Sequence, residues 1–207
     1  MVMNFTLDTK PIDRETASDR LEPDLNLEYR LLQSETEIAE YERALYREFT
    51  RKNPHNWLCR NYLLIENNRY RSPISYSTQS VYGIYQRGKL KSAVAINFDS
   101  SSQMQFEAVG FNFDRESVDG NFCEILTFFI CQDEDSNANY FTIIACFKRF
   151  IMAELKNKNI SFALANCTHN LLPLYLKTGW TIMSQRIIGS LKKYLIKYEI
   201  ISENNIK

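Results

Sequence analysis

Residues 162–180 read FALANCTHNLLPLYLKTGW, and this stretch decides the fold. Its beginning belongs to an apolar run, ISFALAN, that is typical of a buried strand over 160–166. The run stops at Asn-Cys-Thr-His, and a short amphipathic segment, LLPLYLKTG, follows it. Because Gly179 is a natural C-terminal stop for a helix, the pattern predicts a strand, a turn at His169 and a short helix over 171–179.

Three strong elements precede this stretch. Residues 139–159, NYFTIIACFKRFIMAELKNKN, carry apolar side chains on more than one side and predict a long, buried helix. Residues 122–130, FCEILTFFI, are apolar enough to predict a central strand. Residues 80–99, SVYGIYQRGKLKSAVAINFD, form two strand-like segments around Arg87-Gly88, which predicts a β-hairpin.

The remaining predicted elements lie before residue 80 and after residue 180. LEYRLL (27–32) predicts a first strand, and Ser34 and Glu37 stand at capping-box spacing before a helix over 34–52. YLLIE (62–66) predicts a short strand that is followed by a polar loop up to residue 79. IIGSLKKYLIKYEI (187–200) predicts one long, half-exposed strand.

This order of elements predicts an α+β fold, with a mixed, mostly antiparallel central sheet flanked by helices. We expect a single domain over 27–201. Residues 1–26 hold few large apolar side chains and predict a flexible arm or lid, and residues 202–207 predict a short tail.

Composition and charge narrow the class of protein. Apolar residues make up 44% of the 207 residues and the formal net charge is zero, so no overall field favours nucleic acid or membrane as a partner. No apolar run approaches the roughly 20 residues of a membrane span, and the N-terminus lacks the apolar segment of a signal peptide. The five cysteines form no CxxC pair. We therefore expect free thiols, no metal and a cytoplasmic protein.

The segments VAINFDSS, MQFEAVGF, CEILTFFI and NCTHNLLPLYLKTGW, in this order, resemble the GNAT acyltransferase superfamily. More narrowly, they are similar to long-chain N-acyl amino acid synthases, to acyl-homoserine-lactone synthases and to maturases that lipidate ribosomally made peptides. The resemblance covers about residues 28–200. It implies a three-layer fold and the transfer of a medium- or long-chain fatty acyl group. The donor would be a thioester of acyl carrier protein or coenzyme A, and the acceptor an amino acid or a Lys or ornithine side chain in a peptide.

One segment departs from that pattern. GNAT enzymes carry a glycine-containing loop before the long helix, whose backbone amides hold the coenzyme A pyrophosphate. Here the loop reads CQDEDSNANYF, which has no glycine and contains the acids Asp133, Glu134 and Asp135. Carboxylates disfavour two phosphates, so the departure weakens a coenzyme A donor more than a carrier-protein donor.

Amine acylation needs a base, and Glu124 within FCEILTFFI is the main candidate. A carboxylate among apolar neighbours has a raised pKa unless it is paired. The alternative is a Glu124 that faces solvent or forms a salt bridge with an arginine.

Three residues within the stretch 162–180 are further candidates for a catalytic role. His169 stands where a strand passes into a helix, and it would move a proton or bind the substrate, or else cap the helix or pack against a neighbour. The resemblance makes Tyr175 a candidate acid for the leaving thiolate, with core packing as the alternative. Cys167, two residues before His169, is more consistent with a small buried side chain than with a nucleophile.

The acyl thioester would lie against the central strand. We expect strand amides around 128–131 to stabilise the oxyanion, and the predicted acyl- and cofactor-binding residues are Phe128, Phe129, Ile130, Cys131 and Asn166. Whether the Phe side chains line an acyl tunnel or form an ordinary core stays open.

Bases outnumber acids between residues 43 and 71, which favours docking of an acidic carrier protein at Arg47, Arg51 and Arg60. A solvated helix face is the alternative. Two other functions remain open, a catalytically inactive GNAT-like binding module and an acyl-homoserine-lactone-type synthase.

Overall fold

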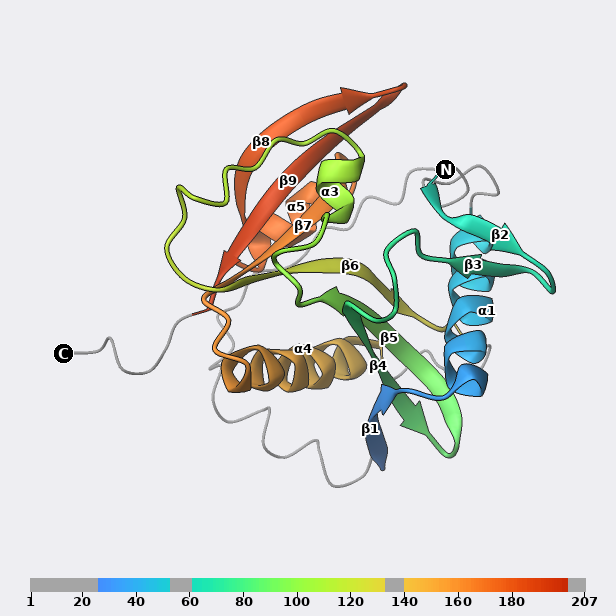
Figure 1. Cartoon of the computed structure of the whole chain (residues 1–207). Helices are drawn as coiled ribbons and strands as arrows, with labels where there is room; N and C mark the ends of the chain where they lie inside the picture. Colours follow the sequence, from blue (N-terminus) through green and yellow to red (C-terminus); the bar gives the residue numbers. More distant parts are fainter. Residues whose placement is uncertain (1–25, 53–60, 133–139, 201–207) are drawn as a thin grey trace, which may run out of the picture.

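A computed structural model describes residues 26–52, 61–132 and 140–200 of the chain. Its centre is a seven-stranded sheet with the order β1-β4-β5-β6-β7-β9-β8 (Figure 1). The strands are β1 (Leu27–Leu32), β4 (Gln79–Gln86), β5 (Lys89–Asn97), β6 (Phe122–Ile130), β7 (Phe162–Thr168), β8 (Thr181–Ile188) and β9 (Leu191–Glu199). The β6–β7 pair is parallel and every other pair in this sheet is antiparallel, which confirms the predicted mixed, mostly antiparallel sheet.

Helices cover both faces of the sheet (Figure 1). The long helices are α1 (Glu35–Lys52) and α4 (Tyr140–Asn157), and the short ones are α3 (Gln105–Ala108) and α5 (Leu172–Lys177). Helix α1 packs against alternate residues of β4 and β5, such as Val81 and Ala93, whereas α4 packs against the intervening residues Tyr82 and Val94. Successive strand residues point to opposite faces, so α1 and α4 form separate outer layers and the α+β prediction is confirmed.

Local sequence signals set the element ends. The Ser34 amide donates to Glu37 Oε2 at 3.0 Å and the Glu37 amide donates to Ser34 Oγ at 3.2 Å, which is the predicted capping box at the start of α1. Arg87 and Gly88 have φ values of 52° and 73°. Positive φ at both central residues is the requirement of a two-residue type I′ hairpin turn, so the predicted turn is confirmed.

Two predictions about the strands were wrong. The single strand predicted over 187–200 is two antiparallel strands, β8 and β9, because the chain reverses after Ile188 at Gly189, where φ is 60°. The polar loop predicted up to residue 79 contains β3 (Arg69–Arg71), which pairs with β2 (Leu63–Ile65). Apolar content identified the buried strands but missed these exposed ones.

The sheet opens between β6 and β7. Their parallel pairing runs from Phe122 and Phe162 only as far as Ile125 and Ala165. Beyond that point β6 continues beside β5, and β7 continues beside β9. Parallel strands need a crossover connection, which α4 provides. The opening therefore lies at the C-terminal ends of two central strands. The position of His169 in the sequence predicted that substrates approach at this edge of the sheet.

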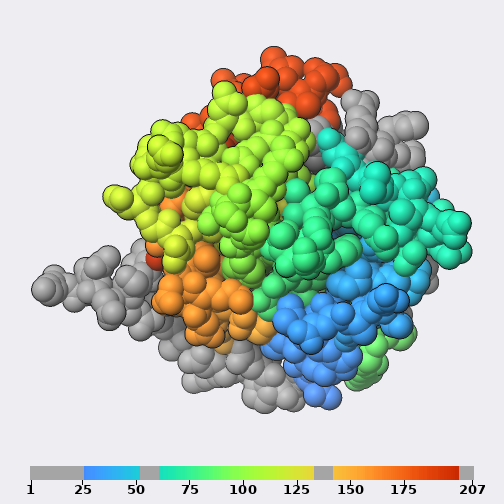
Figure 2. Space-filling model, in the orientation of Figure 1, coloured from blue at the N-terminus to red at the C-terminus, as the bar shows by residue number. Residues whose placement is uncertain are grey.

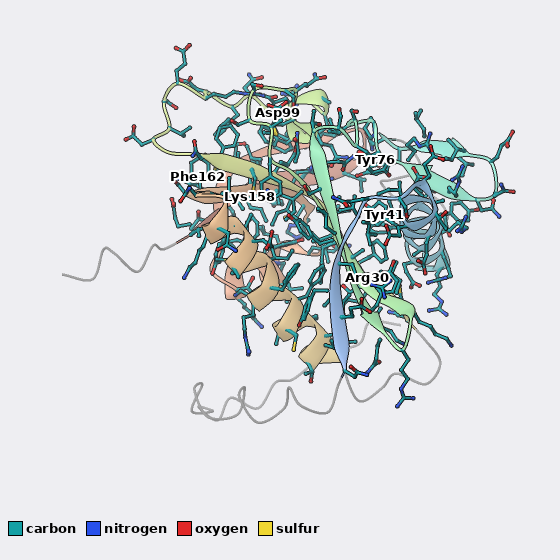
Figure 3. All side chains as sticks on the ribbon, turned by 60° about the horizontal axis from the view of Figure 1, so that its bottom comes forward. Arg30, Tyr41, Tyr76, Asp99, Lys158 and Phe162 are labelled. Atoms are coloured by element: carbon teal, nitrogen blue, oxygen red, sulfur yellow. The ribbon has the colours of Figure 1, made fainter. Side chains whose placement is uncertain are left out.

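The segment between β5 and β6 covers the surface beside the β2–β3 pair (Figure 2). Figure 3 shows the side chains of Tyr41 and Tyr76 near α1, and those of Phe162 and Lys158 at the other end of the sheet, near α4. The segments predicted as an N-terminal arm and a C-terminal tail lie outside the described residues, apart from Asn26. In the described part of the chain, no helix is long and apolar enough to cross a membrane.

Candidate functional site

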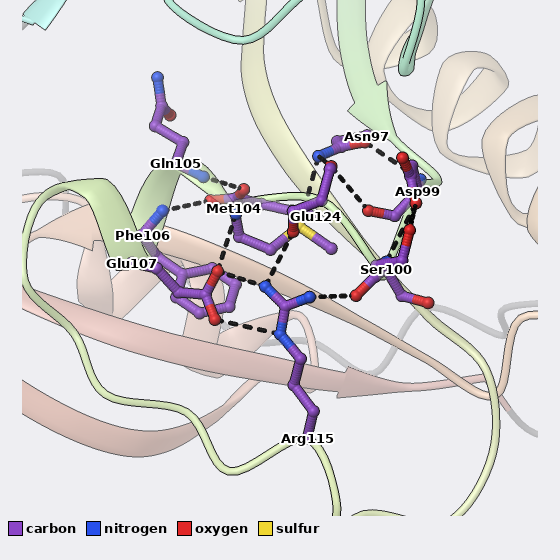
Figure 4. A network of polar contacts seen from close by, with 11 residues as sticks. Asn97, Asp99, Ser100, Met104, Gln105, Phe106, Glu107, Arg115 and Glu124 are labelled. Carbon is purple, nitrogen blue, oxygen red and sulfur yellow. Dashed lines mark hydrogen bonds and ion pairs between the residues drawn. The ribbon is translucent and has the colours of Figure 1, made fainter.

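Glu124 lies on β6, one residue before its pairing with β7 ends, and its side chain is 0% exposed. It points to the face of the sheet that α3 covers (Figure 4). Its Oε2 accepts a hydrogen bond from the Gln105 amide at 2.6 Å, and its Oε1 accepts one from the Phe106 amide at 2.8 Å. Among the described residues, no basic side chain forms an ion pair with Glu124. The open alternatives, a solvent-facing side chain or a salt bridge, are therefore not what the structure shows.

The turn that holds Glu124 is itself braced. Glu107 Oε2 accepts a hydrogen bond from the Met104 amide at 2.8 Å, which closes the first turn of α3. Arg115 pairs with Glu107 and also donates to the Ser102 carbonyl at 2.8 Å (Figure 4). These contacts fix the two amides that face Glu124, so its carboxyl group is held in one position.

Burial raises the pKa of Glu124 to about 8, because the low-dielectric surroundings disfavour the charged form more strongly than the two amide hydrogen bonds favour it. Glu107 raises this pKa further, whereas Arg115 lowers it. A carboxyl group with a pKa near the working pH can take up and release a proton during a reaction.

Further polar groups lie around Glu124 in the interior. Tyr41 and Thr127 share a hydrogen bond at 2.7 Å. The Tyr62 hydroxyl and Gln105 Nε2 are both buried and lie close to each other. Burial raises the pKa of Tyr62, interactions with Gln105 and Ser72 lower it in part, and the charge of Glu124 raises it again.

Lys193 on β9 is a second buried ionisable group that sequence reasoning missed. It is 2% exposed, and its Nζ donates to Asn166 Oδ1 at 2.6 Å. Burial lowers the pKa of Lys193 to about 7, although the charges of Cys167 and Glu124 oppose that shift. The sequence signal that could have identified Lys193 is a lysine at an inward-facing position of an otherwise apolar strand. Assigning that position requires the turn between β8 and β9 to be recognised first.

The structure does not bring His169 to Glu124. Glu124 pairs with Leu164, which stands five residues before His169, a separation of about 16 Å along an extended strand. The His169 side chain is exposed, and its Nδ1 lies 3.2 Å from the Tyr194 hydroxyl. No side chain caps α5, because the N-cap residue is Leu171.

Tyr175 and Cys167 lie on the opposite face of the sheet from Glu124, in the apolar cluster under α5. The Tyr175 ring meets that of Trp180 edge-on, with centroids 5.4 Å apart. Burial raises the pKa of Tyr175 to about 12 and that of Cys167 to about 11. The core-packing alternative thus describes their surroundings, and both groups hold their protons at neutral pH. None of the described cysteines, Cys123, Cys131, Cys146 and Cys167, forms a disulfide, and all four are buried.

The predicted acyl-binding residues divide between the two faces of the sheet. Phe128 is 39% exposed and lies against Phe147 of α4, whereas Phe129 and Cys131 belong to the core under α1. The Cys131 amide donates to the Lys91 carbonyl at 2.8 Å and is engaged in the sheet. Amides alternate in direction along an antiparallel strand, so those of Phe128 and Ile130 point away from β5, toward the opening.

The predicted docking arginines are partly described. Arg47 pairs with Glu48 at 2.9 Å, and Arg51 Nη1 donates to the Gln132 carbonyl at 2.8 Å. The basic end of α1 therefore lies beside the end of β6. Arg60, together with the acidic loop at 133–135, lies outside the described residues. Within 26–52, 61–132 and 140–200, no cluster of His, Cys, Asp and Glu could hold a metal ion.

The sequence matches no protein-family model and no curated protein. Solved structures do match the fold. The AHL synthase LasI superimposes with a TM-score of 0.68 at 11% identity, covering 87% of this chain and 93% of that one. FeeM, an N-acyl amino acid synthase from uncultured soil microbes, gives 0.54 at 12% identity over 84% and 90% of the chains.

The ribosomal-protein-S18-alanine N-acetyltransferase from Escherichia coli gives a TM-score of 0.53 at 10% identity, over 87% of this chain and 99% of that one. This chain has the fold of these acyltransferases. The resemblance noted in the sequence motifs is thereby confirmed at the level of the fold.

Proposed function

We propose that the chain is an N-acyltransferase, which moves a medium- or long-chain fatty acyl group from a carrier thioester to a primary amine. The acceptor is an amino acid, or a Lys or ornithine side chain in a ribosomally made peptide. The observation that carries the proposal is Glu124, a fully buried carboxyl group held by two amides beside the opening of the sheet. The fold shared with acyl-transferring enzymes supports the same reaction.

The reaction begins with a proton transfer. The substrate amine arrives as an ammonium ion, and the Glu124 carboxylate removes one proton. The neutral amine then attacks the thioester carbonyl, and the amides of Phe128 and Ile130 stabilise the oxyanion that forms. The C–S bond breaks, and an amide and a thiol leave. Asn166, on the β7 side of the opening, orients the bound acyl group.

The donor is more consistent with acyl carrier protein than with coenzyme A. The residues before α4 lack the glycines that admit a pyrophosphate and include three acids. The exposed arginines at the end of α1, Arg47 and Arg51, offer positive charge to an acidic carrier near the end of β6.

The test is direct acyl transfer by the purified chain. It is incubated with acyl carrier protein or coenzyme A thioesters of increasing chain length, together with free amino acids or Lys- and ornithine-containing peptides, and the products are read by mass spectrometry. We expect N-acylated amines in two-carbon mass steps. An acyl-lactone formed when S-adenosylmethionine is added as the acceptor would instead indicate a homoserine-lactone-type synthase, and no acylation with any donor and acceptor would contradict the proposal in favour of an inactive binding module.

A further inference from the structure

In the proposed reaction, no residue has yet been assigned to donate a proton to the departing thiolate. Tyr175 is the residue that the family resemblance offers for it. Its ring is packed against Trp180 on the far face of the sheet from Glu124, and a pKa of about 12 makes it a weak acid. Lys193 is a stronger acid than Tyr175, with a pKa of about 7, and it lies on the same face of the sheet as Glu124.

Lys193 lies on the same face of the sheet as Glu124. Leu164, Leu195 and Phe122 pack together on that face, and strand alternation places Asn166, Lys193 and Glu124 on it as well. Lys193 is paired with Thr168, yet its side chain reaches back along β7 to Asn166 Oδ1. Asn166 immediately follows Ala165, the last β7 residue that pairs with β6. The Lys193 ammonium therefore lies on the β7 side of the opening, with Glu124 on the β6 side.

The surroundings of Lys193 tune it toward proton donation. A fully buried lysine is rare, because an ammonium group loses its hydration there. Cys167 from β7 and Glu124 from β6 raise its pKa, burial lowers it more strongly, and Arg186 stands opposite it in the register with β8. A lysine that titrates near neutrality gives up its proton readily to an alkyl thiolate, whose conjugate acid has a pKa of about 8.5.

We propose that Lys193 is the acid of the acyl transfer, and that its ammonium group donates a proton to the departing sulfur. The inference rests on the proposed function. As the C–N bond forms and the C–S bond breaks, the sulfur takes one proton from Lys193, which becomes a neutral amine. The nitrogen, once bonded to the acyl carbon, releases a second proton to the solvent, which leaves the neutral amide. Glu124 holds the first proton that it removed from the substrate, and passing that proton to Lys193 restores both groups. No oxidant or further reactant is needed.

The experiment compares two donors with the same acyl chain, an alkyl thioester of pantetheine and an aryl thioester of thiophenol. An aryl thiolate leaves without needing a proton, whereas an alkyl thiolate needs one. Single-turnover rates are measured for Lys193→Met, for Lys193→Arg and for Lys192→Met, a matched control at the adjacent, exposed lysine. A melting curve establishes folding, and an apolar side chain replacing a buried cation is expected to leave the melting temperature equal or higher.

We expect both Lys193 variants to slow the alkyl thioester by about a hundredfold or more and the aryl thioester by less than about tenfold. Arginine keeps the charge but does not release its proton, so it should not rescue the reaction. Equal slowing of both donors, or rescue by arginine, would overturn the role of Lys193 while leaving acyl transfer intact. If the wild type acylates nothing from either donor, the proposed function fails, and the inference fails with it.

Discussion

Two glutamates in the described part of the chain are completely buried, and their surroundings are opposite in character. Glu42 on α1 accepts hydrogen bonds from Arg71 Nε at 2.8 Å and from the Tyr76 hydroxyl at 3.1 Å, and Arg69 lies 3.5 Å away. Glu124 receives two backbone amides and no ion pair from the described residues. Both side chains are 0% exposed.

The difference separates a structural carboxylate from a candidate catalytic one. Two guanidinium groups compensate the charge of Glu42, so that its burial joins α1 to β3. The charge of Glu124 is only partly compensated, and its pKa is about 8 for that reason. Burial alone therefore does not mark the site, whereas burial without a counter-charge does.

The largest expected effect is on catalysis. Glu124→Gln should lower the rate of amine acylation by about 10²–10⁴-fold, because the carboxamide cannot accept the substrate proton. Glu42→Gln is the matched control and, where folded, should stay within about tenfold of the wild type. The rates are measured by mass spectrometry of the N-acyl product. Equal losses in the two variants would show that Glu124 acts only through the fold.

The second effect is on stability and should fall on the other glutamate. Glu42→Gln should lower the free energy of unfolding by about 2–4 kcal/mol, since it leaves Arg69 and Arg71 without their partner. We expect the lower end of this range because Arg71 is partly exposed. Urea unfolding at pH 6 measures it, with Glu124→Gln for comparison. A larger loss for Glu124→Gln would reverse the assignment of the two carboxylates.

A third expectation concerns stability against pH. The pKa of Glu124 rises on folding from 4.5 to about 8. Its contribution to the free energy of unfolding is therefore full below pH 4.5 and is lost as the pH rises toward 8. The pKa of Lys193 falls from 10.5 to about 7, so its contribution is full above pH 10.5 and is lost as the pH falls toward 7.

Together these two groups predict a stability minimum between about pH 7 and 8. Urea unfolding across this range should show the minimum in the wild type and a flatter curve in the Glu124→Gln, Lys193→Met double variant. Identical curves for the two proteins would mean that neither pKa shifts on folding.

The smallest effect concerns the carrier. Arg47→Glu with Arg51→Glu should raise the KM for an acyl carrier protein thioester by about tenfold or less, with an effect that shrinks as salt increases. The KM for a small pantetheine thioester, which offers no acidic surface, serves as the control and should not change. An equal change for both donors would remove these arginines from the docking surface.

The sequence predicted the buried framework well, because apolar periodicity and turn chemistry act locally. The capping box at Ser34, the hairpin turn at Arg87 and the central strand that carries Glu124 all appear in the structure. It failed where exposed strands carry little apolar signal, as at β3 and β8.

The candidate site shows the same limit. A glutamate within FCEILTFFI was recognisable as unusual, and its pKa was expected to be raised. Its amide donors come from Gln105 and Phe106, 18 to 19 residues earlier in the chain, and nothing in their spacing predicts that contact. The burial of Lys193 likewise depends on the pairing of β9 with β7, which is set by the tertiary fold.

The central claim is that Glu124 exchanges a proton near neutral pH, and carboxyl NMR tests it most directly. The full chain is labelled at the glutamate carboxyl carbons, and the Glu124 resonance is assigned by its loss in Glu124→Gln. The account predicts a titration midpoint near pH 8. A midpoint at or below the usual glutamate value of about 4.3 would show a permanently charged carboxylate and would contradict it.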